Sequence, residues 1–167
     1  MPAKKRNSGQ DAIALLKQDH KKVHGMLKKL QNAKNGDGRR NLFGQIQHDL
    51  KIHTQIEEEI FYPAFKNASR TKDEKKLFFE ANEEHHVVDM VLPEMETSSL
   101  GTDEFSAKAK VLLDLVEHHI EEEEGPMFSK VRQEFSKDEL EELGQRMEAS
   151  KQEQMAEEMP EREQVDL

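Results

Sequence analysis

Two short segments of the sequence each place a histidine four residues before a glutamate. His53 and Glu57 form one pair, and His119 and Glu123 form the other. On an α-helix, side chains four residues apart lie on the same face, about one turn from each other. A neutral imidazole and a carboxylate this close together can bind one metal ion, and they suit iron, manganese or zinc. Each pair is therefore a candidate half of a metal site.

A lone histidine precedes each pair, so the whole pattern occurs twice. The segment around His20 resembles the segment around His85 at an offset of 65 residues, and the two His-x-x-x-Glu pairs are offset by 66 residues. A repeat of this kind indicates two similar structural units. Here we expect two helical hairpins, each of which supplies a lone histidine and a histidine–glutamate pair.

The residues of this pattern fall on the helix faces that must be buried. Apolar residues recur at steps of three and four along four segments; the four histidines occupy such steps, and the two glutamates lie beside them. Two buried carboxylates without cations would be strongly unfavourable. A dinuclear cation centre would neutralise them, with the candidate ligands His20, His53, Glu57, His85, His119 and Glu123. The alternative is a plain structural bundle whose histidines are hydrogen-bonded core residues.

Four long amphipathic helices must position these residues. The apolar pattern predicts helices at residues 10 to 33, 39 to 67, 72 to 98 and 103 to 133. The segments from Asn35 to Gly38 and from Ser98 to Thr102 are predicted loops, with Thr102 as an N-cap. Three sites should distort, kink or end the helices, namely Pro63, Pro93 and Gly125–Pro126.

The domain organisation follows from these segments. A metal-binding four-helix bundle is expected at residues 10–134, and a polar C-terminal helix at 135–157 is opened by a capping box from Ser136 to Glu139. Residues 1–9 should form a flexible basic N-terminus, and residues 158–167 a disordered tail. Every candidate ligand precedes residue 134, so truncation there is expected to leave metal binding intact.

Composition limits the partners and the location. The net charge of −10 repels phosphate backbones, so we expect no nucleic-acid binding. The chain has no cysteine, which excludes disulfides and thiolate ligands. No apolar run has the length of a membrane span and no signal-peptide core follows the basic start, so no membrane association and a cytoplasmic location are expected.

The six candidate ligands, in this order and spacing, resemble the hemerythrin-like, or HHE cation-binding, domain family. The resemblance covers residues 11 to about 133, and residues 53–63 and 117–125 are similar to the two signature segments of that family. It implies an all-α, up-down-up-down four-helix bundle around two non-haem iron ions, Fe2+ or Fe3+, with a bridging oxo or hydroxo group. By the same resemblance, two glutamates bridge the irons and two histidines bind each one: Glu57 and Glu123 as bridges, His20 and His53 on one iron, and His85 and His119 on the other.

Several details of the ligand set stay open. Oxygen-carrying hemerythrins have a fifth histidine one turn after the ligand of the third helix, and this chain has Asp89 there. Asp89 could bind instead, water could fill the position, or His24 could add a ligand. In the fourth helix, His118 or Glu124 could replace its neighbour. Tyr62, the only tyrosine, is expected to pack rather than to donate a hydrogen bond to the site.

Taken together, the residues and the resemblance predict a di-iron protein that binds or reacts with O2, peroxide or nitric oxide. Such a protein could be an oxidoreductase for peroxide or nitric oxide. The alternative is a non-catalytic module that stores or senses iron or oxygen. A diatomic gas or peroxide is the expected small-molecule partner, and the sequence identifies no protein partner.

Overall fold

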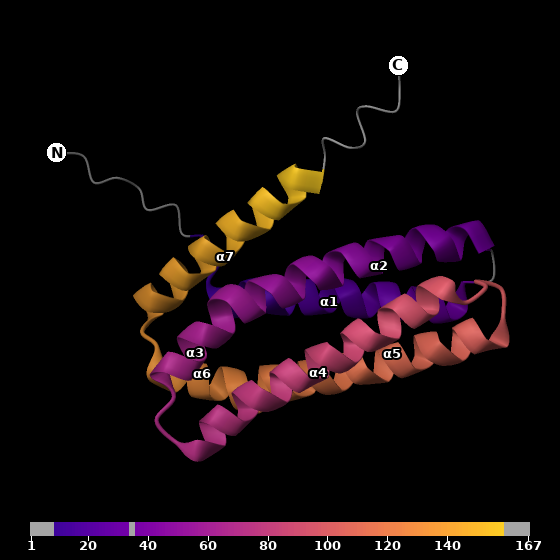
Figure 1. Ribbon diagram of the computed structural model, residues 1–167. Helices are drawn as coiled ribbons and strands as arrows, with labels where there is room; N and C mark the ends of the chain where they lie inside the picture. The colour runs from indigo at the N-terminus through magenta and orange to yellow at the C-terminus, as the bar shows by residue number, and fades with distance from the viewer. Residues whose placement is uncertain (1–8, 34–35, 159–167) are drawn as a thin grey trace.

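Seven α-helices and two π-helical turns make up residues 9–33 and 36–158, the part of the chain that the computed structural model describes (Figure 1). Their order is α1 (Ala12–Asn32), α2 (Gly36–Ile56), η1 (Glu57–Phe61), α3 (Tyr62–Ala68), α4 (Lys72–Thr97), α5 (Asp103–Glu122), η2 (Glu123–Met127), α6 (Phe128–Glu134) and α7 (Lys137–Glu158). No strand occurs in these ranges. The predicted N-terminal arm and C-terminal tail lie almost entirely outside them.

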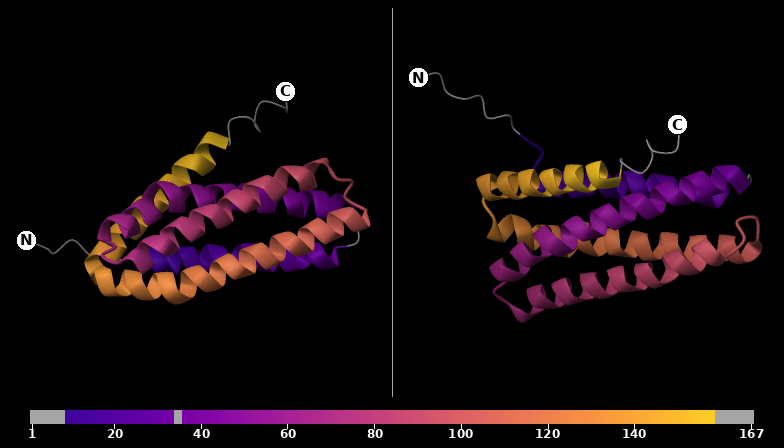
Figure 2. Two further views of the ribbon diagram at one scale, coloured as in Figure 1. Left: turned by 60° about the horizontal axis from the view of Figure 1, so that its bottom comes forward. Right: turned by 45° about the horizontal axis from the view of Figure 1, so that its top comes forward.

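Four long antiparallel rods form a bundle, and α7 lies against its side (Figures 1 and 2). The π-helical turns join α2 to α3 and α5 to α6, so each of these segments is one long rod. Helix α1 packs against α2 and α5, while α4 packs against α5 and α3. Helix α7 packs against α1, α2 and the turn η1. The prediction of an all-α bundle with a fifth, C-terminal helix is confirmed.

Side-chain caps fix several helix starts. The Thr102 hydroxyl accepts a hydrogen bond from the backbone N–H of Phe105, as predicted. The Ser136–Glu139 capping box is also present: the Ser136 hydroxyl accepts from the Glu139 N–H, and the Glu139 carboxylate accepts from the Ser136 N–H. Each such cap typically stabilises a helix by about 1 kcal/mol.

Two boundaries differ from the predictions. Helix α2 begins at Gly36, inside the segment that was expected to be a loop. Helix α4 continues through Pro93 for another turn and ends at Thr97, so this proline does not end it early. The missing N–H of Pro93 removes one internal hydrogen bond, and only the last turn of the helix follows it.

The expected distortions at the other prolines take the form of the two π-helical turns. Each turn begins at a glutamate of the repeated pattern, Glu57 in η1 and Glu123 in η2. Pro63 follows the first turn closely, and Pro126 lies inside the second. A proline lacks an N–H and clashes with the preceding α-helical turn, so a locally wider helix relieves it.

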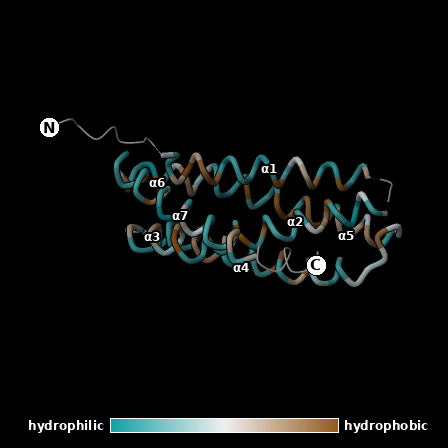
Figure 3. Tube along the Cα trace, turned by 90° about the horizontal axis from the view of Figure 1, so that it is seen from above, coloured by the Kyte–Doolittle hydropathy of each residue, from teal (hydrophilic) through white to brown (hydrophobic). Residues whose placement is uncertain are grey.

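The buried side chains form two clusters along the bundle. One surrounds the π-helical turns and includes the rings of Phe61, Tyr62 and Phe128; it also takes in Leu143 and Met147 of α7. The other fills the far end of the bundle. Hydrophobic positions recur among hydrophilic ones along the long helices of the bundle in Figure 3, as expected for helices with one apolar face. Among the described helices, none is long and apolar enough to cross a membrane.

Candidate metal centre

All six candidate ligands lie inside the bundle, at the level of the two π-helical turns. They come from four rods: α1, α2 with η1, α4, and α5 with η2. None exposes more than 7% of its surface, although all are polar: His20, His53, Glu57, His85, His119 and Glu123. Buried charged groups are rare in proteins unless they are paired or bind a metal.

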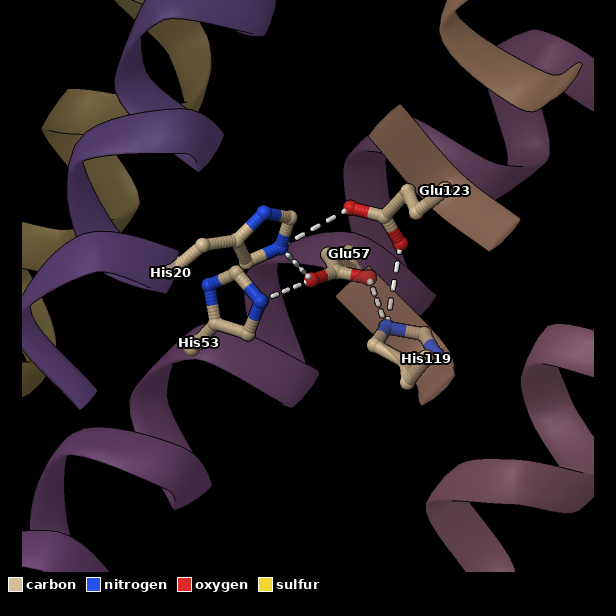
Figure 4. Close-up of side chains that lie close together, drawn as sticks. All are labelled: His20, His53, Glu57, His119 and Glu123. Carbon is tan, nitrogen blue, oxygen red and sulfur yellow. Dashed lines mark ion pairs between the residues drawn. The ribbon is translucent and has the colours of Figure 1, made fainter. Parts of the chain in front are cut away.

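Five of the six converge on one point, as Figure 4 shows. One ligand atom from each lies within 4.8 Å of the corresponding atoms of the others, in the group His20, His53, Glu57, His119 and Glu123. The sixth residue, His85, lies beside this group. Its Nε2 atom is 3.3 Å from Nε2 of His119.

The Glu57 carboxylate lies between two pairs of histidines. Its Oε1 atom forms an ion pair with Nε2 of His53 and lies 4.0 Å from Nε2 of His20. Its Oε2 atom lies 3.5 Å from Nε2 of His85 and 3.6 Å from Nε2 of His119. Each oxygen of one carboxylate therefore faces a different histidine pair.

The Glu123 carboxylate repeats this arrangement. Its Oε1 atom lies 3.2 Å from Nε2 of His20, and its Oε2 atom lies 3.1 Å from Nε2 of His119. Both carboxylates thus connect the two histidine pairs. The pairs are the same two that the family resemblance assigns to separate irons.

Several buried atoms of this centre have no hydrogen-bond partner within residues 9–33 and 36–158. They are Nε2 of His20, Nε2 of His53, both carboxylate oxygens of Glu57 and Oε1 of Glu123. Each unsatisfied buried polar group costs about 1–3 kcal/mol, and charged groups cost more. Cations at this point would satisfy all of them. Four imidazole nitrogens and two carboxylates, without sulfur, suit iron, manganese or zinc, so the residues present fit a metal centre.

An outer carboxylate binds the second ring nitrogen of every candidate histidine. The Nδ1-to-oxygen distances range from 2.6 to 3.3 Å in the pairs His20–Glu124, His53–Asp19, His85–Glu58 and His119–Glu84. When Nδ1–H donates to a carboxylate, Nε2 keeps a lone pair directed at the centre. Partners of this kind orient metal-binding imidazoles and make them better ligands.

In the metal-free protein, protons balance the buried carboxylates. Burial raises the pKa of Glu57, but the charge of His53 and the close contacts with His119 and His85 outweigh it and lower that pKa well below its usual value. Burial lowers the pKa of His53, whereas the Glu57 charge and the Asp19 hydrogen bond raise it to about 10. The Glu123 charge similarly outweighs burial at His119 and raises its pKa well above the usual value. A metal ion must displace these protons when it binds.

The Tyr62 hydroxyl also points into this centre, so the expected packing role is incomplete. It donates a hydrogen bond to Oε2 of Glu123 at 2.7 Å and lies 3.2 Å from Nε2 of His85 and 3.4 Å from Nε2 of His119. Burial and the charges of Glu123 and Glu57 raise the pKa of Tyr62 well above its usual value. The neutral phenol therefore persists in the metal-free protein.

The π-helical turn explains why the sequence pattern did not reveal this residue. Tyr62 follows Glu57 by five residues, which on an ordinary α-helix places the two side chains about 140° apart. In η1 the Tyr62 N–H instead bonds to the Glu57 carbonyl five residues back, and the wider turn brings both side chains to the same face. A glutamate five residues before a tyrosine and close to a proline is the signal that α-helical periodicity misses.

The other candidate residues lie away from the centre. Asp89 is exposed on α4, and Val88 is buried beside it, so the hypothesis of Asp89 as a ligand is wrong. His24 instead forms an ion pair with Glu117 at 2.7 Å at the surface. His118 is 62% exposed, whereas its neighbour His119 is buried. Glu124 reaches the outer nitrogen of His20 and not the centre itself.

Comparisons with known proteins agree with this architecture. A crystal structure of a hemerythrin HHE cation binding domain-containing protein from Mycobacterium kansasii, an Rv2633c homolog, superposes with a TM-score of 0.77. The two chains are 28% identical, and the similarity covers 88% of each. A DNA nickase from Nostoc sp. (strain PCC 7120) is 29% identical over 142 residues. That match covers 85% of this chain but only 38% of the relative, so this chain spans less than half of that protein.

The sequence model of the hemerythrin HHE cation binding domain matches residues 11–131. This range contains all six buried residues of the centre and both π-helical turns. The match covers most of the chain, and the fold and the buried histidine–glutamate metal site accord with it. The chain therefore belongs to the hemerythrin HHE cation-binding domain family.

Proposed function

We propose that this protein holds two non-haem iron ions and binds or reacts with O2, peroxide or nitric oxide. The observation that carries this proposal is the position of Glu57, whose two carboxylate oxygens face separate histidine pairs. A carboxylate that bridges two cations needs this arrangement, and a single metal ion would leave one pair without a cation. Bound iron would supply redox chemistry and positions at which a small molecule can bind.

Different residues of the chain would bind each iron, orient the ligands and hold a proton. His20 and His53 would hold one iron, and His85 and His119 the other, while Glu57 and Glu123 would contact both. The outer carboxylates keep each imidazole in the orientation and tautomer that directs Nε2 inward. The Tyr62 hydroxyl holds a proton 2.7 Å from Oε2 of Glu123, on the side of His85 and His119.

A small cavity beside the histidines supports the choice of a small, uncharged substrate. Its volume is about 20 Å³, which is enough for about one water-sized molecule. The four candidate histidines form part of its wall, together with Asp19, Thr54 and Glu84. The remaining side chains are apolar: Val23, Leu50, Val88, Val116 and Ile120. Such a space admits a diatomic gas or peroxide and excludes larger molecules. It also favours reaction with a small molecule over the alternative of iron storage alone.

The activity named for the Nostoc relative is not part of this proposal. This chain spans 38% of that protein, and its net charge of −10 repels a DNA backbone. The six residues themselves suit iron, manganese and zinc. The proposed redox role excludes zinc, and the family resemblance favours iron over manganese.

The test is to load the protein with Fe2+ without oxygen, measure bound iron, and then mix it with O2, hydrogen peroxide or nitric oxide. We expect two irons per chain and a change in the visible spectrum with at least one of the three. Steady consumption of peroxide or nitric oxide would identify an enzyme, and stoichiometric binding a carrier or sensor. A chain that binds no iron, or whose irons react with none of the three, would overturn the proposal.

A further inference from the structure

Helix α7 lies beyond residues 11–131, the part that the family model matches, yet it connects to a candidate ligand. The Lys151 ammonium lies 2.5 Å from Oδ1 of Asp19, and Oδ2 of Asp19 lies 3.3 Å from Nδ1 of His53. Lys151 of α7 thus contacts Asp19 of α1, and Asp19 contacts His53 of α2, in one line of contacts. This line ends at the metal centre.

The connection is specific to one of the four outer carboxylates. Within residues 9–33 and 36–158, Asp19 is the only one of the four that a lysine contacts. It is also the most buried, whereas the Glu58 side chain at His85 is 44% exposed. The other three can be solvated directly. Asp19 instead depends on Lys151 for a partner on its outer side.

Close packing fixes α7 against the bundle, so Lys151 has a defined position. Leu140, Leu143 and Met147 are buried in the cluster that surrounds the π-helical turns. Gly144 lies against the start of α1 so closely that an added Cβ would be 2.4 Å from the Gln10 carbonyl oxygen. Lys151 follows Gly144 by seven residues, or two turns, so the two positions lie on the same face of the helix.

We propose that α7 acts as a clamp on one half of the metal centre, with Lys151 as a positioning residue. Lys151 holds Asp19, Asp19 orients the His53 ring, and release of α7 would loosen the iron bound by His20 and His53. The iron bound by His85 and His119 would be retained, because no side chain of α7 is among the ion-pair partners of Glu58 and Glu84 in the described part of the chain. This inference rests on the proposed binding of two irons. It adds that the two irons are held with different dependence on the C-terminal helix.

The expected change in the rate of iron release follows from the role of the groups that orient metal-binding histidines. Loss of a group that directly orients a metal-binding histidine typically costs 10- to 100-fold in metal affinity. Lys151 acts one contact further out, so we expect about three- to tenfold faster release of one iron. The Asp19 carboxylate would turn toward water once its lysine is lost, and His53 would lose its fixed orientation.

The test follows the release of Fe2+ from the full-length, iron-loaded protein to a chromogenic chelator, without oxygen. Lys151→Met should accelerate the release of one of the two irons, and Lys151→Arg, which keeps the charge, should restore the wild-type rate. Lys22→Met is the matched control, because Lys22 forms a similar ion pair with Asp49 at 2.8 Å. Among the described residues it forms no ion pair with a partner of a candidate ligand. This variant should release iron at the wild-type rate.

Two further variants separate the possible outcomes. Glu84→Ala removes the carboxylate that binds Nδ1 of His119, so it should accelerate release of the iron that Lys151→Met leaves unchanged. Gly144→Ala should displace α7 and accelerate release of the same iron as Lys151→Met. Equal release by wild type and Lys151→Met, or acceleration of both irons together, would overturn the clamp. If wild-type protein bound no iron at all, that result would overturn the proposed function and, with it, the clamp.

Discussion

The two hairpins supply equivalent outer carboxylates to the centre. Asp19 and Glu84 each stand one residue before a lone histidine, and each binds the paired histidine of its own half, His53 or His119. Glu58 and Glu124 each stand one residue after a central glutamate, and each binds the lone histidine of the other half. The sequence repeat thus extends from the six candidate ligands to the groups that orient them.

The two halves differ at the aromatic residue five positions after each central glutamate. Tyr62 stacks on His85 with ring centroids 5.4 Å apart, and Phe128 stacks on His20 at 6.2 Å. The two positions are equivalent, but Tyr62 alone has a hydroxyl, which points at the second histidine pair. Helix α7 adds a second difference, on the other half of the centre. It contacts the first histidine pair through Lys151 and Asp19. A nearly symmetric frame therefore gives the two histidine pairs different surroundings.

Loss of the shared carboxylate should have the largest effect. Glu57→Ala should abolish binding of both irons, because each histidine pair loses an oxygen ligand and its counter-charge. The matched control is Glu59→Ala, since Glu59 is exposed on the same turn and accepts a hydrogen bond only from Gln55 among the described contacts. Elemental analysis should find two irons in the control and almost none in Glu57→Ala. If only one iron is lost, Glu57 serves one half and does not bridge.

Removal of α7 should have the second-largest effect, and this effect should be on the stability of the fold. Truncation after residue 134 exposes the cluster that Leu140, Leu143 and Met147 cover. Each buried side chain of this size contributes about 1.5–3 kcal/mol, so the loss should be about 5 kcal/mol or more. The sequence pattern alone predicts that metal binding survives, but this packing indicates a weakened fold and loss of iron from the first half. Urea unfolding and iron counts on the truncated chain decide between the two outcomes.

The metal-free protein should become less stable as the pH rises above neutrality. Folding raises the pKa of His53 from an ordinary value of 6.5 to about 10. Its contribution to stability is complete below pH 6.5, where both the folded and unfolded states are protonated, and is lost between pH 6.5 and about 10. Urea midpoints measured in this window should fall, and His53→Gln should weaken the dependence. A flat profile in the metal-free wild type would show that His53 is not protonated in the fold.

Exchange of the two aromatic residues should have the smallest effect. Tyr62→Phe makes the second half resemble the first and removes a hydrogen bond to the buried Glu123 carboxylate. Hydrogen bonds to charged groups contribute about 1.5–3 kcal/mol, so the metal-free protein should lose about 2 kcal/mol. Phe128→Tyr is the reciprocal change and tests whether a hydroxyl near His20 is tolerated. Iron-loaded Tyr62→Phe should still contain two irons; loss of the iron at His85 and His119 would make Tyr62 essential for metal binding.

Much of this centre is predictable from the sequence, because its residues follow α-helical periodicity. His20, His53, His85 and His119 occupy core steps of an apolar pattern, and all four are buried. Periodicity fails where the helix departs from 3.6 residues per turn, as it does between Glu57 and Tyr62.

Two other features depend on packing that no local pattern records. On α4, the next buried residue after His85 is Val88. Asp89, one residue further on, therefore points to solvent. The contact between Lys151 and Asp19 joins residues 132 positions apart, on a helix whose sequence is mostly polar. The position of Gly144 against the start of α1 shows how closely these two helices approach each other.

The central claim is that Glu57 and Glu123 connect two separate cations, each held by its own histidine pair. The most direct measurement is an anomalous difference map from crystals of the iron-loaded protein, with data collected at the iron absorption edge. We predict two peaks, one beside Nε2 of His20 and His53 and the other beside Nε2 of His85 and His119, both within reach of Glu57. A single peak, or two peaks that share one histidine pair, would contradict the account.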